Sequence, residues 1–210
     1  MNTPIARFLN SDNMLANLVL TRLRDQNTSP RDFRASVVKL TPMVLAESMK
    51  SFPLQEATIA TPMATTTGYF LPHEVAVVPI FRAGLGMLDP MLEFFPNAQV
   101  GHLVIQRDEE TAVPRRLLDK LPDLFNRHVF LIDIMLATGG SACDALDLVK
   151  AHGGTDIRLL CLVAAPQGVA QVHSQHPDVP IFGAVLDERL DERKYIIPGL
   201  GDAGDRLNGS

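Results

Sequence analysis

The second half of the chain repeats one pattern, in which a run of apolar residues leads into a turn of small residues and then into a segment with helical spacing. The apolar runs cover residues 75–80, 100–105, 129–134, 157–165 and 181–186. Runs that are apolar throughout, rather than at every second position, are typical of strands buried on both faces of a parallel sheet. The pattern therefore predicts an α/β fold with a mostly parallel sheet flanked by helices.

The N-terminal part differs, because its apolar residues between positions 12 and 52 recur at helical spacing. A second helix is expected to begin at Pro30, with Thr28 or Ser29 as its N-cap. Residues 53–73 contain many Thr and Pro and fit neither a helical nor a strand pattern clearly. We therefore expect N-terminal helices, an ambiguous connection and then the sheet.

Length and composition narrow the possible functions. With 210 residues and no long linker or repeat, residues 1–210 are expected to form a single domain. The net charge of −5 and the isoelectric point near 5.6 argue against a nucleic-acid or membrane-surface binder, although a local anion site stays open. No apolar run approaches the ~18–20 residues of a membrane span, and the N-terminus lacks the pattern of a signal peptide. Cys143 and Cys161 are expected to be buried thiols in a reducing compartment, which makes the cytoplasm the expected location.

Ligands of a parallel α/β sheet bind beyond the carboxyl ends of the strands, so the residues that follow each run are the most informative. Asp133 interrupts the run 129–134 near its end. A carboxylate among apolar residues is costly unless it is paired or hydrogen-bonded, and at this edge it can accept hydrogen bonds from sugar hydroxyls. The alternative is a structural Asp that caps a neighbouring loop.

A turn of small residues, Ala137 to Ser141, follows Asp133. Its glycines allow the backbone to approach a ligand, and the amides at the start of the next helix favour a phosphate. No Lys follows the glycines, so the turn is not the P-loop of a nucleoside triphosphate site. The alternative is an ordinary turn with Ser141 as helix N-cap. An acid suited to ribose beside a cradle for phosphate favours a ribose 5-phosphate.

Two arginines also follow apolar runs. Arg82 precedes a glycine-containing turn and offers a bidentate fork to a second phosphate. Arg107 opens a charged segment, residues 107–110. That segment is either a solvated loop or a mobile lid that excludes water during a reaction.

The tail, residues 195–206, is rich in glycine. Gly199, Gly201 and Gly204 match G-x-G-x-x-G, but too little chain follows for the helix and second strand of a dinucleotide site, so we reject that interpretation. The tail is either disordered or wraps its backbone amides and carbonyls around a small planar ligand, and the apolar residues after Tyr195 favour a packed start. The histidines form no zinc-ligand pattern, so no metal ligand is assigned.

These motifs resemble the type I phosphoribosyltransferases, whose motif for phosphoribosyl diphosphate (PRPP) is similar to residues 133–141. More closely, the chain is similar to the uracil phosphoribosyltransferase family. The matching segments are residues 21–28, 33–34, 78–87, 107–111, 133–141, 163–166 and 195–205. The tail is the most specific of them, because other phosphoribosyltransferases lack it. The resemblance implies the type I fold, with N-terminal helices and a C-terminal tail that forms a hood over the base.

The resemblance also implies the reaction, in which uracil and PRPP give UMP and diphosphate in pyrimidine salvage. It assigns catalysis to Arg82, Arg107, Asp133 and Asp202. It assigns PRPP binding to Arg82, Arg107, Asp133, Ile134, Met135, Leu136, Ala137, Thr138, Gly139, Gly140, Ser141 and Asp202. It assigns uracil binding to Ile196, Gly201, Asp202 and Ala203. It further implies Mg²⁺ held mainly by substrate oxygens and water, a homodimer or higher homo-oligomer, and activation by GTP in some members.

The chain departs from the family pattern at Ile134, where the family usually has Pro, at Gln106, and in residues 112–116, which lack a common Tyr. These departures affect the loop that begins at Arg107 more than the turn at residues 137–141 that would bind phosphate. Two alternatives stay open. One is the same class of enzyme acting on another base, and the other is a regulatory protein that keeps the PRPP fold, has little catalysis and binds RNA or a partner.

Overall fold

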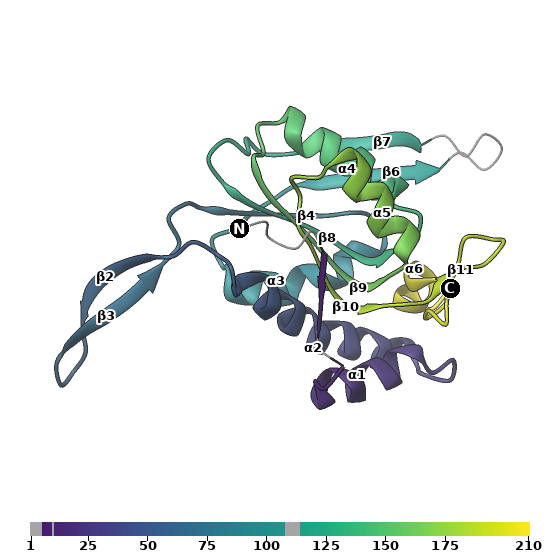
Figure 1. Cartoon of the computed structure of the whole chain (residues 1–210), viewed down its shortest axis with the longest axis horizontal. Coiled ribbons are helices and arrows are strands. Elements are labelled where there is room, and N and C mark those ends of the chain that lie inside the picture. The colour runs from purple at the N-terminus through teal and green to yellow at the C-terminus, as the bar shows by residue number, and fades with distance from the viewer. Residues whose placement is uncertain (1–5, 10, 108–113) are drawn as a thin grey trace.

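A central parallel sheet organises the molecule (Figure 1). The computed structural model describes residues 6–9, 11–107 and 114–210. Its six-stranded sheet has the order β1-β10-β9-β8-β4-β5, and every neighbouring pair is parallel. The strand bounds are β1 Ala6–Phe8, β4 Val75–Pro79, β5 Gln99–Val100, β8 His128–Leu136, β9 Asp156–Ala164 and β10 Ile181–Leu186. The predicted α/β fold with a mostly parallel sheet is confirmed.

Helices cover both faces of the sheet, with α1 to α3 on one face and α4 and α5 on the other (Figure 1). The helix bounds are α1 Met14–Arg24, α2 Pro30–Met49, α3 Leu88–Phe94, α4 Gly140–Ala151 and α5 Pro166–Gln175. Strand β8 serves both layers, because Phe130 and Ile132 join the first apolar cluster while Val129 and Leu131 join the second. Burial on both faces explains why the strand is apolar at successive positions.

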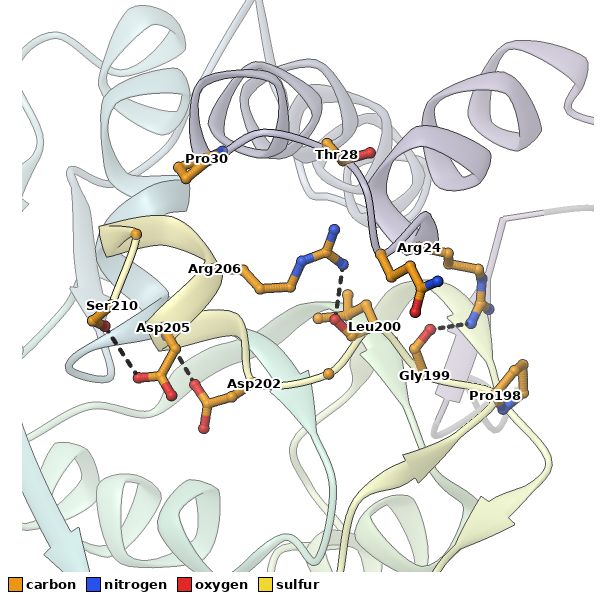
Figure 2. A pocket seen from close by; sticks show the side chains of 13 residues that line it. Arg24, Thr28, Pro30, Pro198, Gly199, Leu200, Asp202, Asp205, Arg206 and Ser210 are labelled. Atoms are coloured by element: carbon orange, nitrogen blue, oxygen red, sulfur yellow. Dashed lines mark hydrogen bonds between the residues drawn. The ribbon is translucent and has the colours of Figure 1, made fainter.

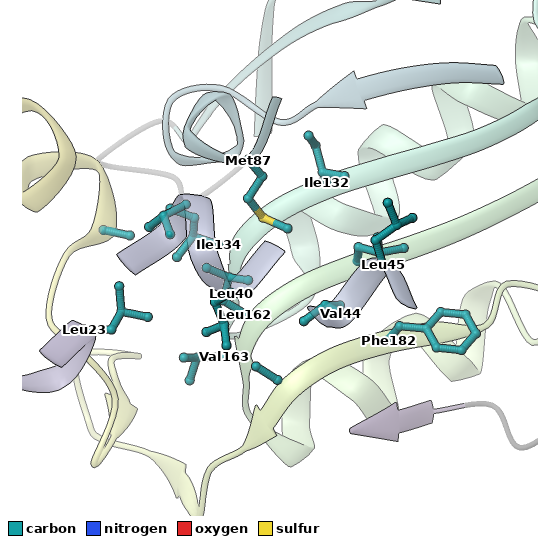
Figure 3. Close-up of a cluster of buried hydrophobic side chains, with 14 of the residues drawn as sticks. Leu23, Leu40, Val44, Leu45, Met87, Ile132, Ile134, Leu162, Val163 and Phe182 are labelled. Carbon is teal, nitrogen blue, oxygen red and sulfur yellow. The ribbon is translucent and has the colours of Figure 1, made fainter. Parts of the chain in front are cut away.

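Helix α2 forms the centre of the first layer. Figure 3 shows Leu40 and Val44 of this helix beside Leu162 of β9, all within one buried cluster. The helix begins as expected at Pro30, and the Ser29 hydroxyl accepts a hydrogen bond from the Asp32 amide at 3.2 Å. The cap is therefore Ser29 and not Thr28.

The strand expected over residues 100–105 divides between two sheets. β5 joins the central sheet, whereas β6 (His102–Arg107) pairs in the antiparallel sense with β7 (Pro114–Lys120) and keeps one parallel bridge, from Leu103 to Ile80, just past the end of β4. A short apolar run shows that a segment is extended and partly buried, but its choice of partner depends on residues outside the run.

Residues 53–73, which fit no pattern clearly, contain a two-stranded arm. Strands β2 (Gln55–Ala60) and β3 (Thr65–Phe70) pair antiparallel and project from the body of the molecule (Figure 1). Nearly every residue of the arm is exposed, so the arm has no core of its own.

Among the described residues, no helix has both the length and the apolar character needed to cross a membrane.

Candidate functional site

The carboxyl ends of the central strands meet at one edge of the sheet. Leu136 of β8 and Leu186 of β10 both pair in register with Ala164 of β9, so the three strands end in one row. The segments that follow them are residues 137–141, 165–168 and 187–188. Sequence reasoning therefore located this edge correctly.

The turn after β8 forms an uncapped helix start. Gly139 is the N-cap of α4 at a φ of +84°, and its lack of a side chain leaves the first-turn amides without a side-chain cap. The first turn carries no acidic residue. Such a helix start binds anions. Ser141 lies inside the helix, so the alternative in which Ser141 is the N-cap is wrong.

A second turn packs against this one. A Cβ at Gly168, which follows β9, would lie 2.5 Å from the carbonyl oxygen of Ala137 and 2.7 Å from that of Leu136. Only glycine permits this approach of two backbones. The 165–168 segment therefore packs directly against the turn that follows β8.

Asp133 to Leu136 lie in β8 and not in the turn. Ile134 and Leu136 are buried, whereas Asp133 and Met135 keep some exposure. Desolvation by burial raises the pKa of Asp133 to about 7, and hydrogen bonds from the amides of Ile134 and Met135 oppose the rise. The carboxylate thus has donors from its own backbone and titrates close to neutral pH.

Arg82 lies just after β4, beside the C-terminal helix α6 (Ala203–Asn208). Its guanidinium forms an ion pair with Asp205 at 3.1 Å, and both side chains are largely exposed. An anion that binds Arg82 must compete with this carboxylate. Arg107 ends β6, but its side chain and residues 108–110 lie outside the described part of the chain, so the predicted lid stays a prediction.

The tail is folded, as its apolar start suggested. Strand β12 (Ile196–Ile197) pairs with β11 (Arg189–Leu190), and the chain then turns at Gly199, whose φ is +60°, to reach α6. Ile196 and Ala203 are buried and Gly201 is exposed. Asp202 is the N-cap of α6, where its Oδ1 accepts a hydrogen bond from the Asp205 amide at 2.9 Å.

A cavity of about 600 Å³ separates the tail from the connection between α1 and α2. Figure 2 shows Arg24 and Arg206 reaching from opposite sides to backbone carbonyls of the tail, those of Gly199 and Leu200. Sequence reasoning did not single out these arginines, nor Asp187 or Asp205. Arg24 falls inside the matching segment 21–28, and Asp205 and Arg206 lie at the end of the glycine-rich tail, whereas no sequence signal pointed to Asp187.

Proteins of known structure share this architecture. An adenine phosphoribosyltransferase from Trypanosoma brucei matches with a TM-score of 0.59 at 15% identity, over 95% of this chain and 89% of that chain. A protein from Aquifex aeolicus matches with a TM-score of 0.88 at 36% identity, over 96% of this chain and 97% of that chain. The fold is that of the phosphoribosyltransferases.

Sequence comparison narrows the class. The family model described as uracil phosphoribosyltransferase matches residues 10–210. A uracil phosphoribosyltransferase from Clostridium tetani is 50% identical over 193 residues, which cover 91% of this chain and 92% of the relative. Another from Dictyoglomus thermophilum is 46% identical over 201 residues, which cover 95% of this chain and 97% of the relative. The chain belongs to the uracil phosphoribosyltransferase family.

Proposed function

We propose that the protein transfers the 5-phosphoribosyl group of PRPP to uracil and releases UMP and diphosphate, a pyrimidine-salvage reaction. One observation carries the proposal: in a chain of this family, the Asp133 carboxylate lies near the end of β8, a helix start without a side-chain cap follows that strand, and a folded glycine-rich tail follows β12.

The phosphoribosyl part of the site is assigned to β8, the turn and the arginines. The amides at residues 137–141 would bind the 5-phosphate through the start of α4. The carboxylate of Asp133, in the strand that leads to the turn, would accept hydrogen bonds from the ribose hydroxyls. Arg82 and Arg107 would bind the diphosphate, with Arg82 exchanging Asp205 for the substrate.

The base part of the site is assigned to Ile196, Gly201, Asp202 and Ala203, which flank the turn at Gly199. Backbone amides and carbonyls would pair with the polar edge of uracil. Cytosine carries an amino group in place of one uracil oxygen, so it would leave buried groups unpaired at about 1–3 kcal/mol each.

The reaction breaks the bond between ribose C1 and a diphosphate oxygen and forms a bond from C1 to N1 of uracil. Positive charge develops on the sugar and negative charge on the leaving group, so the chain contributes mainly by positioning and by charge stabilisation from its arginines. No protein nucleophile is required. Asp202 is proposed as acceptor of the uracil proton, because its cap bond uses Oδ1 and leaves Oδ2 for this role.

Mg²⁺ is proposed as the cofactor. Among the described residues no group of three or more His, Cys, Asp or Glu side chains could hold a metal ion. We propose that diphosphate and ribose oxygens and water would hold most of the ion's coordination positions, and that Asp133 or Asp202 could supply a protein carboxylate. When bound, the ion would neutralise charge on the diphosphate.

The test is a UMP-formation assay with purified protein, uracil and PRPP, with Mg²⁺ and with a chelator present. We expect UMP to form only with the metal, and cytosine or adenine to compete poorly. Preferred turnover of another base would identify the same class of enzyme with a different specificity. Absence of turnover with every base would favour a regulatory protein, and a titration with RNA at several salt concentrations would then test that alternative.

We also propose that the protein is a homodimer or higher homo-oligomer. The projecting arm exposes Ile59, Met63, Tyr69 and Phe70, with Met63 93% exposed. A two-stranded hairpin with exposed apolar residues is marginal alone and is stabilised when another surface covers it. Light scattering on the full chain and on a Met63→Lys, Tyr69→Lys variant would test this, with the variant expected to dissociate.

Two further proposals concern regulation and location. The first rests on the family resemblance and the second on the two thiols. GTP is proposed as an activator, and the UMP assay with and without GTP tests it. The cytoplasm is proposed as the location, since Cys143 and Cys161 are free and buried as predicted. Fractionation of the producing cells would test the location.

A further inference from the structure

Asp187 is a buried carboxylate that the reaction does not use directly. It lies one residue past β10, and only 6% of its surface is exposed. Its amide donates a hydrogen bond to the carbonyl oxygen of Ala164 at 2.8 Å, so its backbone is tied to the end of β9. A buried carboxylate requires partners for its oxygens, and those partners indicate what it holds.

The partners of Asp187 are Arg24 and Gly199. Arg24, in the last turn of α1, forms a bidentate pair with both carboxylate oxygens at 2.9 and 2.5 Å. The amide of Gly199 donates to Oδ2 of the same carboxylate at 2.9 Å. Arg24 also donates to the carbonyl oxygen of Gly199 at 2.8 Å. Both polar groups of Gly199 are therefore held by one ion pair.

Gly199 is the point at which the tail turns between its base-binding residues. A Cβ at this position would lie 2.0 Å from the carbonyl oxygen of Ile196, and Gly201 follows two residues later. A loop that reads a base through backbone groups depends on the direction of each peptide plane, and such a loop has no side chain of its own to fix that direction. The pair of Arg24 and Asp187 supplies that constraint from outside the loop.

We propose that Arg24 and Asp187 are positioning residues that clamp Gly199 and thereby set the geometry with which the tail binds uracil. This inference rests on the proposed function and deepens it. Because Asp187 is anchored to β9 and β9 pairs in register with β8 up to Leu136, the clamp also sets the distance between the base loop and the phosphate turn.

The test compares two ligands that differ only by the base. Binding of UMP and of ribose 5-phosphate is measured by calorimetry for wild type, Arg24→Met, Arg24→Lys and Asp187→Asn. We expect Arg24→Met and Asp187→Asn to weaken UMP binding about tenfold or more, while ribose 5-phosphate binding stays near that of wild type. Arg24→Lys keeps the positive charge but loses the planar fork that pairs with both carboxylate oxygens, so it should recover part of the loss. In kinetics, the KM for uracil should rise while the KM for PRPP does not.

Arg158→Met is the matched control. Arg158 is also buried, bonded to the Ser48 carbonyl and stacked on Phe52, but it lies near the start of β9, at the far end from the site. The Arg158→Met variant should be less stable than wild type, but the ratio of its affinities for UMP and for ribose 5-phosphate should not change. If Arg24→Met or Asp187→Asn bound both ligands as wild type does, or lost both equally, the clamp proposal would be overturned. A wild type that binds UMP no better than ribose 5-phosphate would overturn the proposed function itself.

Discussion

The turn proposed to bind the 5-phosphate and the loop proposed to read the base belong to one site, but different interactions hold them in place. Residues 137–141 continue β8 into α4 and pack directly against the backbone at Gly168. Residues 198–202 follow β12, outside the central sheet, and are held by hydrogen bonds from Arg24 and Arg206. Main-chain packing fixes the first segment, whereas arginine side chains fix the second, one from distant α1 and one from α6 just after the loop.

This difference has a consequence for substitutions. A backbone contact depends on the strands themselves, so a change at the turn should affect every property that depends on PRPP. A side-chain clamp can be altered without moving the sheet, so a change there should affect only properties that depend on the base. The adenine phosphoribosyltransferase that shares the fold at 15% identity shows that the sheet architecture does not depend on close sequence similarity.

Asp133→Asn should give the largest effect, on the PRPP side of the site. Turnover should fall about a hundredfold, because a neutral amide replaces charge-assisted hydrogen bonds to the ribose. Burial raises the pKa of Asp133 to about 7, so the carboxylate opposes folding increasingly as pH rises from its unfolded pKa through that value. The variant should therefore be more stable than wild type at pH 8, by at most about 4 kcal/mol, and nearly equal at pH 4.

Steady-state kinetics and urea unfolding at the two pH values measure these effects. Unchanged turnover would remove Asp133 from the ribose site. A variant less stable than wild type at high pH would contradict the pKa argument.

Gly168→Ala comes next, because it breaks the backbone contact itself. The new methyl group would press on the carbonyl oxygens of Leu136 and Ala137 and displace the phosphate turn. We expect the KM for PRPP to rise about tenfold and the stability to fall by about 1–3 kcal/mol. Gln167→Ala, an exposed change in the same segment, is the control. A normal KM for PRPP in Gly168→Ala would show that the turn does not need this contact.

The ion pair between Arg82 and Asp205 joins the PRPP side of the site to the C-terminal tail. Substitutions in this pair should change the KM for PRPP less than Gly168→Ala does. Arg82→Ala should weaken PRPP use, whereas Asp205→Asn should strengthen it by removing a competing anion. Exposed pairs are worth up to about 1 kcal/mol, so the KM for PRPP should fall by no more than about fivefold in Asp205→Asn. Kinetics at low and high salt provide the check, since the gain should shrink with salt. A rise in this KM would mean that Asp205 assists PRPP binding.

Ile134→Pro should have the smallest effect, a shift in pH dependence. Proline has no amide hydrogen, so the variant loses one hydrogen bond that lowers the pKa of Asp133. Pairing of β8 with β4 ends at Ile132, so the change need not disrupt that ladder. If activity needs the carboxylate, its loss on acidification should begin at higher pH, by less than about one pH unit. The pH profile of kcat/KM measures this, and a shift toward lower pH would contradict it.

Buried strands and helix starts could be predicted from the sequence, because they depend on residues that are close together along the chain. The apolar runs at 129–134 and 157–165 identified buried strands, and Pro30 after Ser29 identified a helix start. The arm at residues 55–70 could not be predicted, because a hairpin with no buried face has no apolar periodicity. Asp202 was expected to meet PRPP and uracil, but its role as helix cap became visible only when α6 was seen to start there.

By itself, the sequence determined the parallel sheet, the edge at which its strands end and the turn that follows β8, because backbone hydrogen bonding and burial impose short, regular periods on the chain. Only the tertiary structure decided which charges meet. Arg24 and Asp187 are 163 positions apart, and Arg82 and Asp205 are 123 apart. No local period relates such residues, so their pairing follows from where the folded elements bring them.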